Sequence, residues 1–321
     1  MTSGAALGGA LLATLASPAT WPLALATFLL RGGILVVVLP IVVLPSPVGL
    51  GNLLAPTLVA VVFRGLSIEI VAIVSVSAIA IVAWIVVGGL VAATLEADAA
   101  RKVAGDEEVS GASIVSSGDG PAAPDRMVAA WVLAARLLAH APTGVGIIWG
   151  SVRLVDVAYG ELTSPADVTT PIALRVLAGA PEVTVVLLMA WAMGEIVGGL
   201  AARRIVLDGI RVTGALRDAL IATVRHPVGV AAAFLVPLAG LLLVVLPSTL
   251  AAAVAWSAVR VAMRAPAELI VGTLAVVLFV SLWIVGLLLI AVTAAWRAAV
   301  WSVAHRDLWP RRAQPPTLEP G

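Results

Sequence analysis

The amino-acid sequence predicts an all-α membrane protein, a polytopic bundle of about six spanning helices that forms a single integral membrane domain over residues 1–321. Hydrophobic residues make up 61% of the chain and charged residues 12%, whereas an average soluble domain is roughly 45–50% apolar and about 25% charged. Apolar stretches of about 20 residues, the length of a membrane-crossing helix, recur along the chain. A chain with so little polar surface is expected to have lipid as its main solvent.

Several classes of function are disfavoured by what the sequence lacks. There is no cysteine, which excludes disulfides and thiolate chemistry. The formal net charge is +1 without a clustered basic face, so nucleic acid is not an expected partner. Phosphate-binding loops, nucleophile elbows and His-Glu-x-x-His zinc motifs are also missing. We therefore expect no enzyme activity, no cofactor and no metal site.

The first segment, residues 1–20, is apolar but contains no Lys or Arg, whereas a secretory signal peptide begins with positive charge. We expect it to be an interfacial lead-in. The six predicted spans follow at residues 21–44, 68–94, 127–150, 172–201, 228–247 and 267–295.

The connections between these spans differ in character. Two are apolar but carry prolines and arginines, one after the first span and one after the fifth, which predicts short elbow helices at the membrane surface, with re-entrant segments as the alternative. Residues 96–126 are rich in Gly, Ser and Asp and predict a flexible cytoplasmic loop. Residues 203–225 mix arginines with apolar residues at helical spacing, which predicts an amphipathic surface helix. The tail, residues 307–321, is expected to be disordered.

The distribution of basic residues predicts the orientation. With the 96–126 loop, the 203–225 loop and the tail on one side, that side carries twelve Lys and Arg residues and the other side five. The positive-inside rule then places both termini in the cytoplasm. Only Lys102 is lysine among 19 basic residues, a bias typical of GC-rich bacterial genomes. The expected location is the bacterial cytoplasmic membrane.

An internal repeat emerges when the chain is compared with itself. Trp84-Ile85-Val86 recurs as Trp283-Ile284-Val285, and Glu69 recurs as Glu268 at the same offset of 199 residues. A middle copy with unequal spacings is weaker. The pattern predicts three tandem two-helix units in parallel orientation, each with an elbow bearing Arg and Glu. Chance similarity between Ala-, Val- and Leu-rich spans is the alternative.

Ionisable residues inside the predicted spans are the first candidate site. Counting along the helices places four of them at similar depth in the cytoplasmic half of the bilayer: Arg31, Arg136, His140 and Glu195. Such a cluster is costly in lipid unless its members pair. It is either a polar cavity for an anionic headgroup or solute, with His140 able to handle protons, or an ion pair of Glu195 with Arg31 or Arg136 that fixes helix packing, which is the interpretation we favour.

The second candidate site is the set of external elbow pairs. They are Arg64 with Glu69, Arg175 with Glu182, and Arg264 with Glu268. Near an interface such charges usually anchor helix ends. If the three elbows converge instead, they would form a polar ring able to bind phosphate headgroups.

The six-span plan and the ending TAAWRAAVWSVAHRDLW resemble the membrane domain attached to some bacterial glycerophosphodiester phosphodiesterases and its stand-alone relatives. The likeness covers the span layout and Trp296 to Arg306. It implies a membrane module without the family's catalytic barrel, because the only His-Arg pair, His305-Arg306, has no barrel strands to present it. The resemblance carries over no functional residue.

Two classes of function remain. One is a non-catalytic membrane module that binds lipid, or that scaffolds or regulates another membrane protein or a second copy of itself. The other is a transporter of a small solute or lipid that uses the buried Arg/His/Glu cluster. Broken spans would favour transport. The candidate breaks are at Pro142 in span three and at Pro237 in span five.

Overall fold

The computed structural model describes residues 4–39, 41–42, 65, 67–109, 125–164, 170, 172–264 and 269–309. Every regular element in these ranges is helical, so the all-α prediction is confirmed. Five helices in the described part are long and apolar enough to cross a membrane, and the bent pair Arg126–Ala139 and Ala141–Glu161 makes a sixth span if it is counted as one. The prediction of about six spans is therefore confirmed.

The first half of the chain contains a short N-terminal helix and three spans. They are built from α1 (Gly4–Ala16), η1 (Pro18–Thr20), α2 (Trp21–Phe28), the π-helical turn η2 (Leu29–Gly33), α3 (Ile34–Val38), α5 (Ile68–Ala83), the π-helical turn η3 (Trp84–Gly88), α6 (Gly89–Val109), α7 (Asp125–Ala139) and α8 (Ala141–Thr163). The second half contains α9 (Ile172–Gly179), α10 (Pro181–Asp208), α11 (Val212–Arg225), α12 (Pro227–Arg264) and α13 (Leu269–Leu308).

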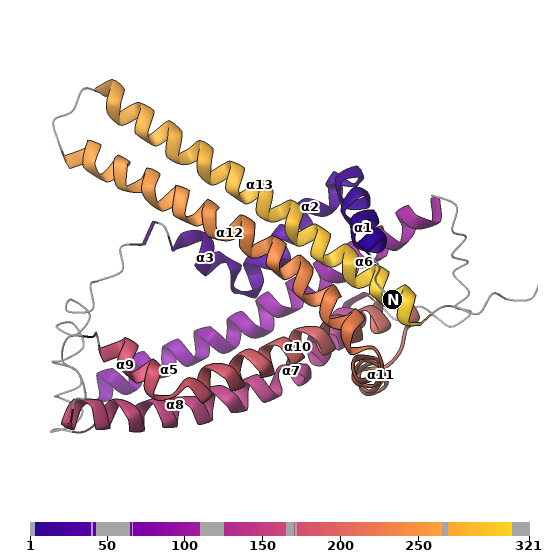
Figure 1. Ribbon diagram of the computed structural model, residues 1–321, viewed down its shortest axis with the longest axis horizontal. Coiled ribbons are helices and arrows are strands. Elements are labelled where there is room, and N and C mark those ends of the chain that lie inside the picture. The colour runs from indigo at the N-terminus through magenta and orange to yellow at the C-terminus, as the bar shows by residue number, and fades with distance from the viewer. Residues whose placement is uncertain are drawn as a thin grey trace, which may run out of the picture.

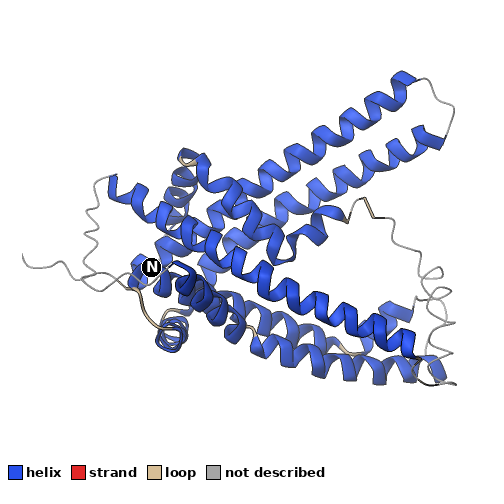
Figure 2. Cartoon of the chain, turned by 180° about the vertical axis from the view of Figure 1, so that it is seen from behind, coloured by secondary structure: helices blue, strands red, loops and turns tan. Residues whose placement is uncertain are grey.

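The helices form two arms that diverge from a common end (Figures 1 and 2). The antiparallel pair α12 and α13 is one arm, and α5, α7, α8 and α10 form the other. The first span, α2 to α3, runs between the arms (Figure 1). The end where α1, α11 and the C-terminal part of α13 lie is called the base below.

The main hydrophobic core lies at the base. Val132, Leu200, Ile205 and Val300 are essentially inaccessible there and pack with many buried alanines. Small residues allow the helices to approach closely, as at Gly199, where a Cβ would come 3.2 Å from the Trp301 ring. The predicted lead-in is helical as α1, and it joins the same core through Ala10.

The prediction of an elbow helix after the fifth span is wrong for the residues of that segment that the structure describes. Residues 248–264 continue α12, which is 38 residues long, although Pro247 lies inside it. Pro247 removes one backbone hydrogen bond. The packing of Ala252, Ala255 and Val259 against Phe279 of α13 stabilises the helix beyond this missing hydrogen bond. The first predicted elbow lies outside the described residues.

Two other connections are also more helical than predicted. The flexible loop was expected from residue 96, but α6 continues to Val109, and residues 110–124 lie outside the described part. The surface helix 203–225 is two elements, because α10 ends at Asp208 and Gly209 adopts a left-handed conformation with φ 67° before α11. At this cap the amide of Gly209 donates to the Ile205 carbonyl at 3.2 Å. The tail is described only to Trp309, with helix to Leu308.

Candidate functional site

A cluster of charged side chains lies where the two arms meet the base. The structure brings together the four residues of the predicted cluster, Arg31, Arg136, His140 and Glu195, and adds three more that sequence reasoning missed. The additions are Glu96 from α6, Arg203 from α10 and Arg297 from α13. Six of the seven side chains come from five helical segments and His140 lies between α7 and α8; the seven are called the arginine cluster below.

Glu96 is the centre of one half of the cluster. Arg136 Nη2 donates to Glu96 Oε1 at 2.6 Å, and Arg203 Nη1 donates to the same oxygen at 2.9 Å. Arg31 Nη2 donates to the other oxygen, Oε2. Glu96 is only 6% exposed, so its charge is compensated by three guanidinium groups instead of water.

Glu195 is the centre of the other half. Arg297 Nη2 donates to Glu195 Oε2 at 2.6 Å, and His140 Nε2 lies 3.4 Å from Oε1. Arg136 Nη1 lies 3.7 Å from Oε2, which is an ion-pair distance but too long for a hydrogen bond. Of the two expected partners of Glu195, Arg136 is therefore close, whereas Arg31 pairs with Glu96 instead.

Arg203 differs from the other arginines because all its nitrogens are occupied. Besides Glu96, its Nε donates to Ser302 Oγ at 3.2 Å and its Nη2 donates to the Ala298 carbonyl at 3.1 Å. The side chain is 1% exposed. Arg203 therefore holds Glu96 and α13 in place and has little donor capacity left for a ligand.

Arg136 has donors that are buried without a partner. Its Nε and Nη1 make no hydrogen bond, although the residue is only 9% exposed. A buried donor left unsatisfied costs about 1–3 kcal/mol, and more when it is charged. The carboxylate of Glu195, 3.7 Å from Arg136 Nη1, offsets part of that cost.

The cavity beside the cluster has a volume of about 330 Å³. Its charged lining residues are four arginines and two glutamates, which leaves an excess of two positive charges: Arg31, Glu96, Arg136, Glu195, Arg203 and Arg297. The remaining lining residues are mostly apolar and include Phe28, Trp191 and Leu241. A cavity with this charge balance favours an anionic ligand, because uncompensated charge is costly away from water.

Two helix breaks meet at the cluster. In the first span Arg31 and Gly32 leave the helical region, and Gly32 has φ 101°, which favours glycine. The break is bridged by Trp84, whose indole Nε1 donates to the Leu30 carbonyl at 3.1 Å. In the third span α7 and α8 meet at a bend of 40° beside His140, so the expected break near Pro142 is present. Pro237 lies inside α12, which is not interrupted there.

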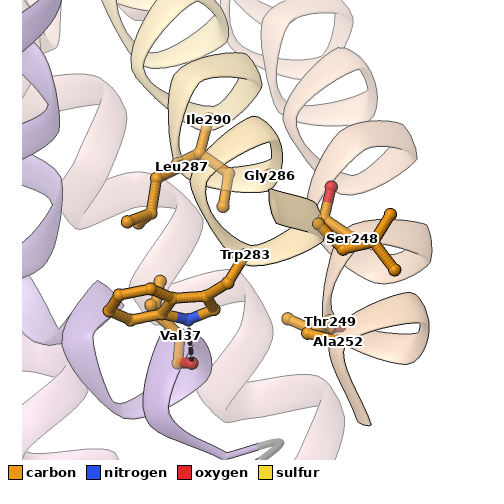
Figure 3. Close-up of a pocket in the computed structure, with 9 residues that line it drawn as sticks. Val37, Ser248, Thr249, Ala252, Trp283, Gly286, Leu287 and Ile290 are labelled. Carbon is orange, nitrogen blue, oxygen red and sulfur yellow. Dashed lines mark hydrogen bonds between the residues drawn. The ribbon is translucent and has the colours of Figure 1, made fainter. Parts of the chain in front are cut away.

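A smaller pocket lies where the first span contacts α12 and α13 (Figure 3). It lies between Val37, Ser248 and Gly286, and its volume is about 10 Å³, room for roughly one water molecule. Trp283 Nε1 donates to the Val37 carbonyl at 3.4 Å on one side of it (Figure 3). Trp84 and Trp283, the matched residues of the predicted repeat, thus each bond a carbonyl of the first span from a different arm.

Helix lengths give the distance of Glu96 and Arg297 from the opposite ends of their helices. Glu96 follows Ile68 by 28 residues, and Arg297 follows Leu269 by 28 residues. At 1.5 Å per residue, both are about 42 Å along their helices. A bilayer has about 30 Å of hydrocarbon and about 40–45 Å with its headgroup regions. Glu96 and Arg297 therefore lie toward the base-side ends of their helices, whereas Arg31 follows Pro18 by 13 residues within the first span, Pro18–Val38.

The elbow pairs are arranged differently from the prediction. Arg175 Nη1 lies 2.9 Å from Glu161, and Arg153 Nε lies 3.1 Å from Glu182. The predicted Arg175–Glu182 pair is wrong, because the chain leaves the helical conformation at Ala180 between α9 and α10, and both residues face side chains of α8.

The other elbow residues do not gather into a ring within the described part of the chain. Glu69 lies in the first turn of α5, and Arg264 is the last residue of α12. Arg64 and Glu268 lie outside the described residues. A phosphate-binding ring at this end of the molecule therefore has no support from the described geometry.

No family model, curated protein or solved structure matches this chain. The resemblance to the membrane domain of glycerophosphodiester phosphodiesterases therefore stays a prediction.

Proposed function

We propose that this chain is a non-catalytic integral membrane protein that binds the phosphate group of an anionic membrane lipid in the arginine cluster. The observation that carries the proposal is the excess of two positive charges in a cavity of about 330 Å³ between membrane helices. Phosphate oxygens are good acceptors for guanidinium groups, which donate two parallel hydrogen bonds to them.

Three arginines have the geometry to bind such a group. Arg31, Arg136 and Arg297 each use only part of their donors on glutamates, and all three line the cavity. Glu96 and Glu195 keep these arginines apart at fixed positions, as a preorganised site requires. We place the phosphate on the base side of the bilayer, because Glu96 and Arg297 lie toward the base-side ends of their helices.

The direct test is lipid binding by the purified full chain with Arg31→Gln. We expect the variant to retain phosphatidic acid or phosphatidylglycerol about tenfold less well than the native chain in native mass spectrometry, because a charge-assisted hydrogen bond contributes about 1.5–3 kcal/mol. Arg31→Lys should recover part of the loss. Phosphatidylcholine, which has no net charge, should be retained weakly by every variant.

Arg153→Gln is a matched control, since Arg153 is also paired with acidic residues but does not line the cavity. It should leave lipid retention unchanged. Equal retention of anionic lipid by Arg31→Gln, Arg297→Gln and the native chain would show that the cluster is only a packing device.

A second candidate function is transport of an anion or lipid. It is favoured by the two helix breaks at the cluster, at Gly32 and beside His140, because transporters bind substrates at discontinuous helices. The expected difference is measurable in proteoliposomes. A transporter would move a fluorescent anionic lipid or labelled phosphate across the bilayer at a rate lowered by Arg31→Gln, whereas a binding module would show none above protein-free vesicles.

A further inference from the structure

A second cavity continues from the arginine cluster. Its volume is about 470 Å³, and it shares Arg31, Arg136, Trp191 and Glu195 with the first cavity. The two spaces are therefore adjacent, with the cluster as their common wall. This second cavity is called the lateral groove below.

The lateral groove has a small charged part and a larger apolar part. Arg31, Arg136, His140 and Glu195 are its charged or titratable lining residues. The rest of its wall is mainly apolar and comes from η2, α3, η3, α6 and α7: Leu30, Leu35, Trp84, Ile85, Leu133 and Leu137. A space lined by cationic groups and by a larger number of apolar side chains matches an amphiphile and not a free inorganic anion.

The apolar part of the groove opens on the outside of the helix bundle. Leu35 is 74% exposed and Leu137 is 48% exposed, and both belong to helices of the membrane-spanning part. Outside such side chains lies the hydrocarbon of the bilayer. A chain lying in the groove would thus remain in contact with the membrane interior.

The shape of the groove depends on two glycines and one tryptophan. Gly32, with φ 101° and no atom within 4 Å of the point where a Cβ would lie, breaks the first span beside the groove. At Gly89 a Cβ would come 2.7 Å from Cδ1 of Leu133, which lines the groove, so a larger residue would require that side chain to move. The indole of Trp84, which also lines the groove, is held by its hydrogen bond to the Leu30 carbonyl. These features keep the groove open.

We propose that the ligand is a phospholipid that enters sideways from the bilayer, with its phosphate at Arg31 and Arg136 and one acyl chain in the lateral groove. The inference rests on the proposed phosphate-binding function and adds the entry route and the position of the chain. Arg31 and Arg136 line both spaces, so one phosphate bound there leaves a chain directly at the mouth of the groove.

The experiment uses the full chain in detergent with three ligands: a phosphatidic acid carrying a photoreactive group in one acyl chain, glycerol 3-phosphate as the headgroup without chains, and monoolein as a chain without phosphate. Photolabelled peptides are mapped by mass spectrometry. We expect labelling at Leu35, Trp84 or Leu137, and its loss in Arg31→Gln. Monoolein should compete poorly, because it lacks the phosphate.

Leu137→Trp fills the groove without changing a charge, and Leu138→Trp is its matched control on the same helix at 56% exposure, outside both cavities. Leu137→Trp should reduce photolabelling about tenfold, because an indole occupies the space of the chain. It should leave glycerol 3-phosphate binding unchanged. Leu138→Trp should change neither.

The outcomes separate the two proposals. The lateral-groove inference would be overturned, and the phosphate site would remain, if two results occur together. The photolabel would be found outside the groove and be unaffected by Leu137→Trp, and phosphate binding would still depend on Arg31. Lipid and glycerol 3-phosphate binding that are both independent of Arg31 and Arg297 would overturn both. If glycerol 3-phosphate binds as tightly as phosphatidic acid, the acyl chain adds no affinity, and the ligand is a soluble phosphate.

Discussion

At the scale of single residues, one carboxylate organises the cluster. Glu96 contacts three arginines from three helical segments and is nearly inaccessible to water. Without it, Arg31, Arg136 and Arg203 would repel one another at short range in a medium of low dielectric constant. Glu96 is therefore the residue on which the geometry of the phosphate site depends most.

Replacing Glu96 with glutamine should strongly destabilise the protein. Removing one partner of a buried ion pair typically costs about 3–5 kcal/mol, because the other charges stay buried and uncompensated. The measurement is thermal unfolding in detergent. Asp98→Asn is the control on the same helix, since Asp98 is exposed and pairs with Arg101 at 3.4 Å, and exposed pairs contribute about 0–1 kcal/mol. Similar losses for both variants would contradict the central role of Glu96.

A double-mutant cycle should locate the partner of Glu195. Arg297 donates to it at 2.6 Å, so Glu195→Gln and Arg297→Gln should be coupled by about 0.5–3 kcal/mol. Glu195→Gln and Arg31→Gln should be closer to additive, because Arg31 pairs with Glu96. Unfolding measurements on the single and double variants test both statements. Strict additivity of the Glu195 and Arg297 losses would rule out the direct pair.

Part of the cluster could be predicted from the sequence for a simple reason. Arg31, Arg136 and Glu195 lie inside apolar runs, where an ionisable group stands out and must find a partner. Glu96, Arg203 and Arg297 lie just past the apolar runs, where charges are ordinary. Glu96 could have been predicted from the continuity of its helix. From Gly89 to Val109 the chain has no proline and is rich in helix formers, so the second span continues through Glu96 and keeps it in the bundle.

At the scale of elements, the break in the first span is the feature that shapes the site. Gly32 has φ 101° and lies next to Arg31, so the break turns that arginine toward Glu96 and not along the helix surface. The sequence placed the spans well because apolar length decides them. It did not reveal this break, because Gly32-Gly33 inside a span fits close helix packing equally well.

Gly32→Ala should therefore destabilise the protein by about 1–2 kcal/mol, the cost of a left-handed conformation for a residue with a Cβ. It should also weaken anionic-lipid retention, because a straighter helix moves Arg31. Gly8→Ala is the control: Gly8 is in the helix α1, has no atom near a Cβ position, and should be neutral or slightly stabilised. A Gly32→Ala variant as stable as Gly8→Ala would show that the break is not required.

At the scale of the whole molecule, the described basic residues of three separate segments collect at the base. They belong to the end of α10, to α11 and to the end of α13: Arg203, Arg204, Arg211, Arg217, Arg225, Arg297 and Arg306. The sequence predicted these segments to share one side from their charge alone, and the fold brings them to one end (Figure 1). The arm that the structure makes from residues 227–308 was less predictable, since proline and arginine in the fifth connection indicated a surface elbow.

Salt bridges also link these segments at the base. Arg204 lies 2.5 Å from Asp208 and 2.7 Å from Asp218, and His305 lies 2.7 Å from Asp208. The contacts join α10, α11 and α13, and Arg204 also lies over the Trp309 ring at 4.8 Å. A polar, partly charged end of this kind fits the aqueous side of a membrane, whereas most side chains of the arms are apolar.

The proposed orientation, with the base in the cytoplasm, follows from the positive-inside rule and can be tested because the chain has no cysteine. Thr213, exposed near the start of α11, marks the base, and Ser164, exposed after α8, marks the opposite end. In intact cells an impermeant thiol reagent should label Ser164→Cys and not Thr213→Cys, because only one end of a spanning bundle faces the outside. After permeabilisation both variants should react, which controls for accessibility. Labelling of Thr213→Cys alone in intact cells would reverse the orientation and place the arginine cluster, with any lipid it binds, in the outer leaflet.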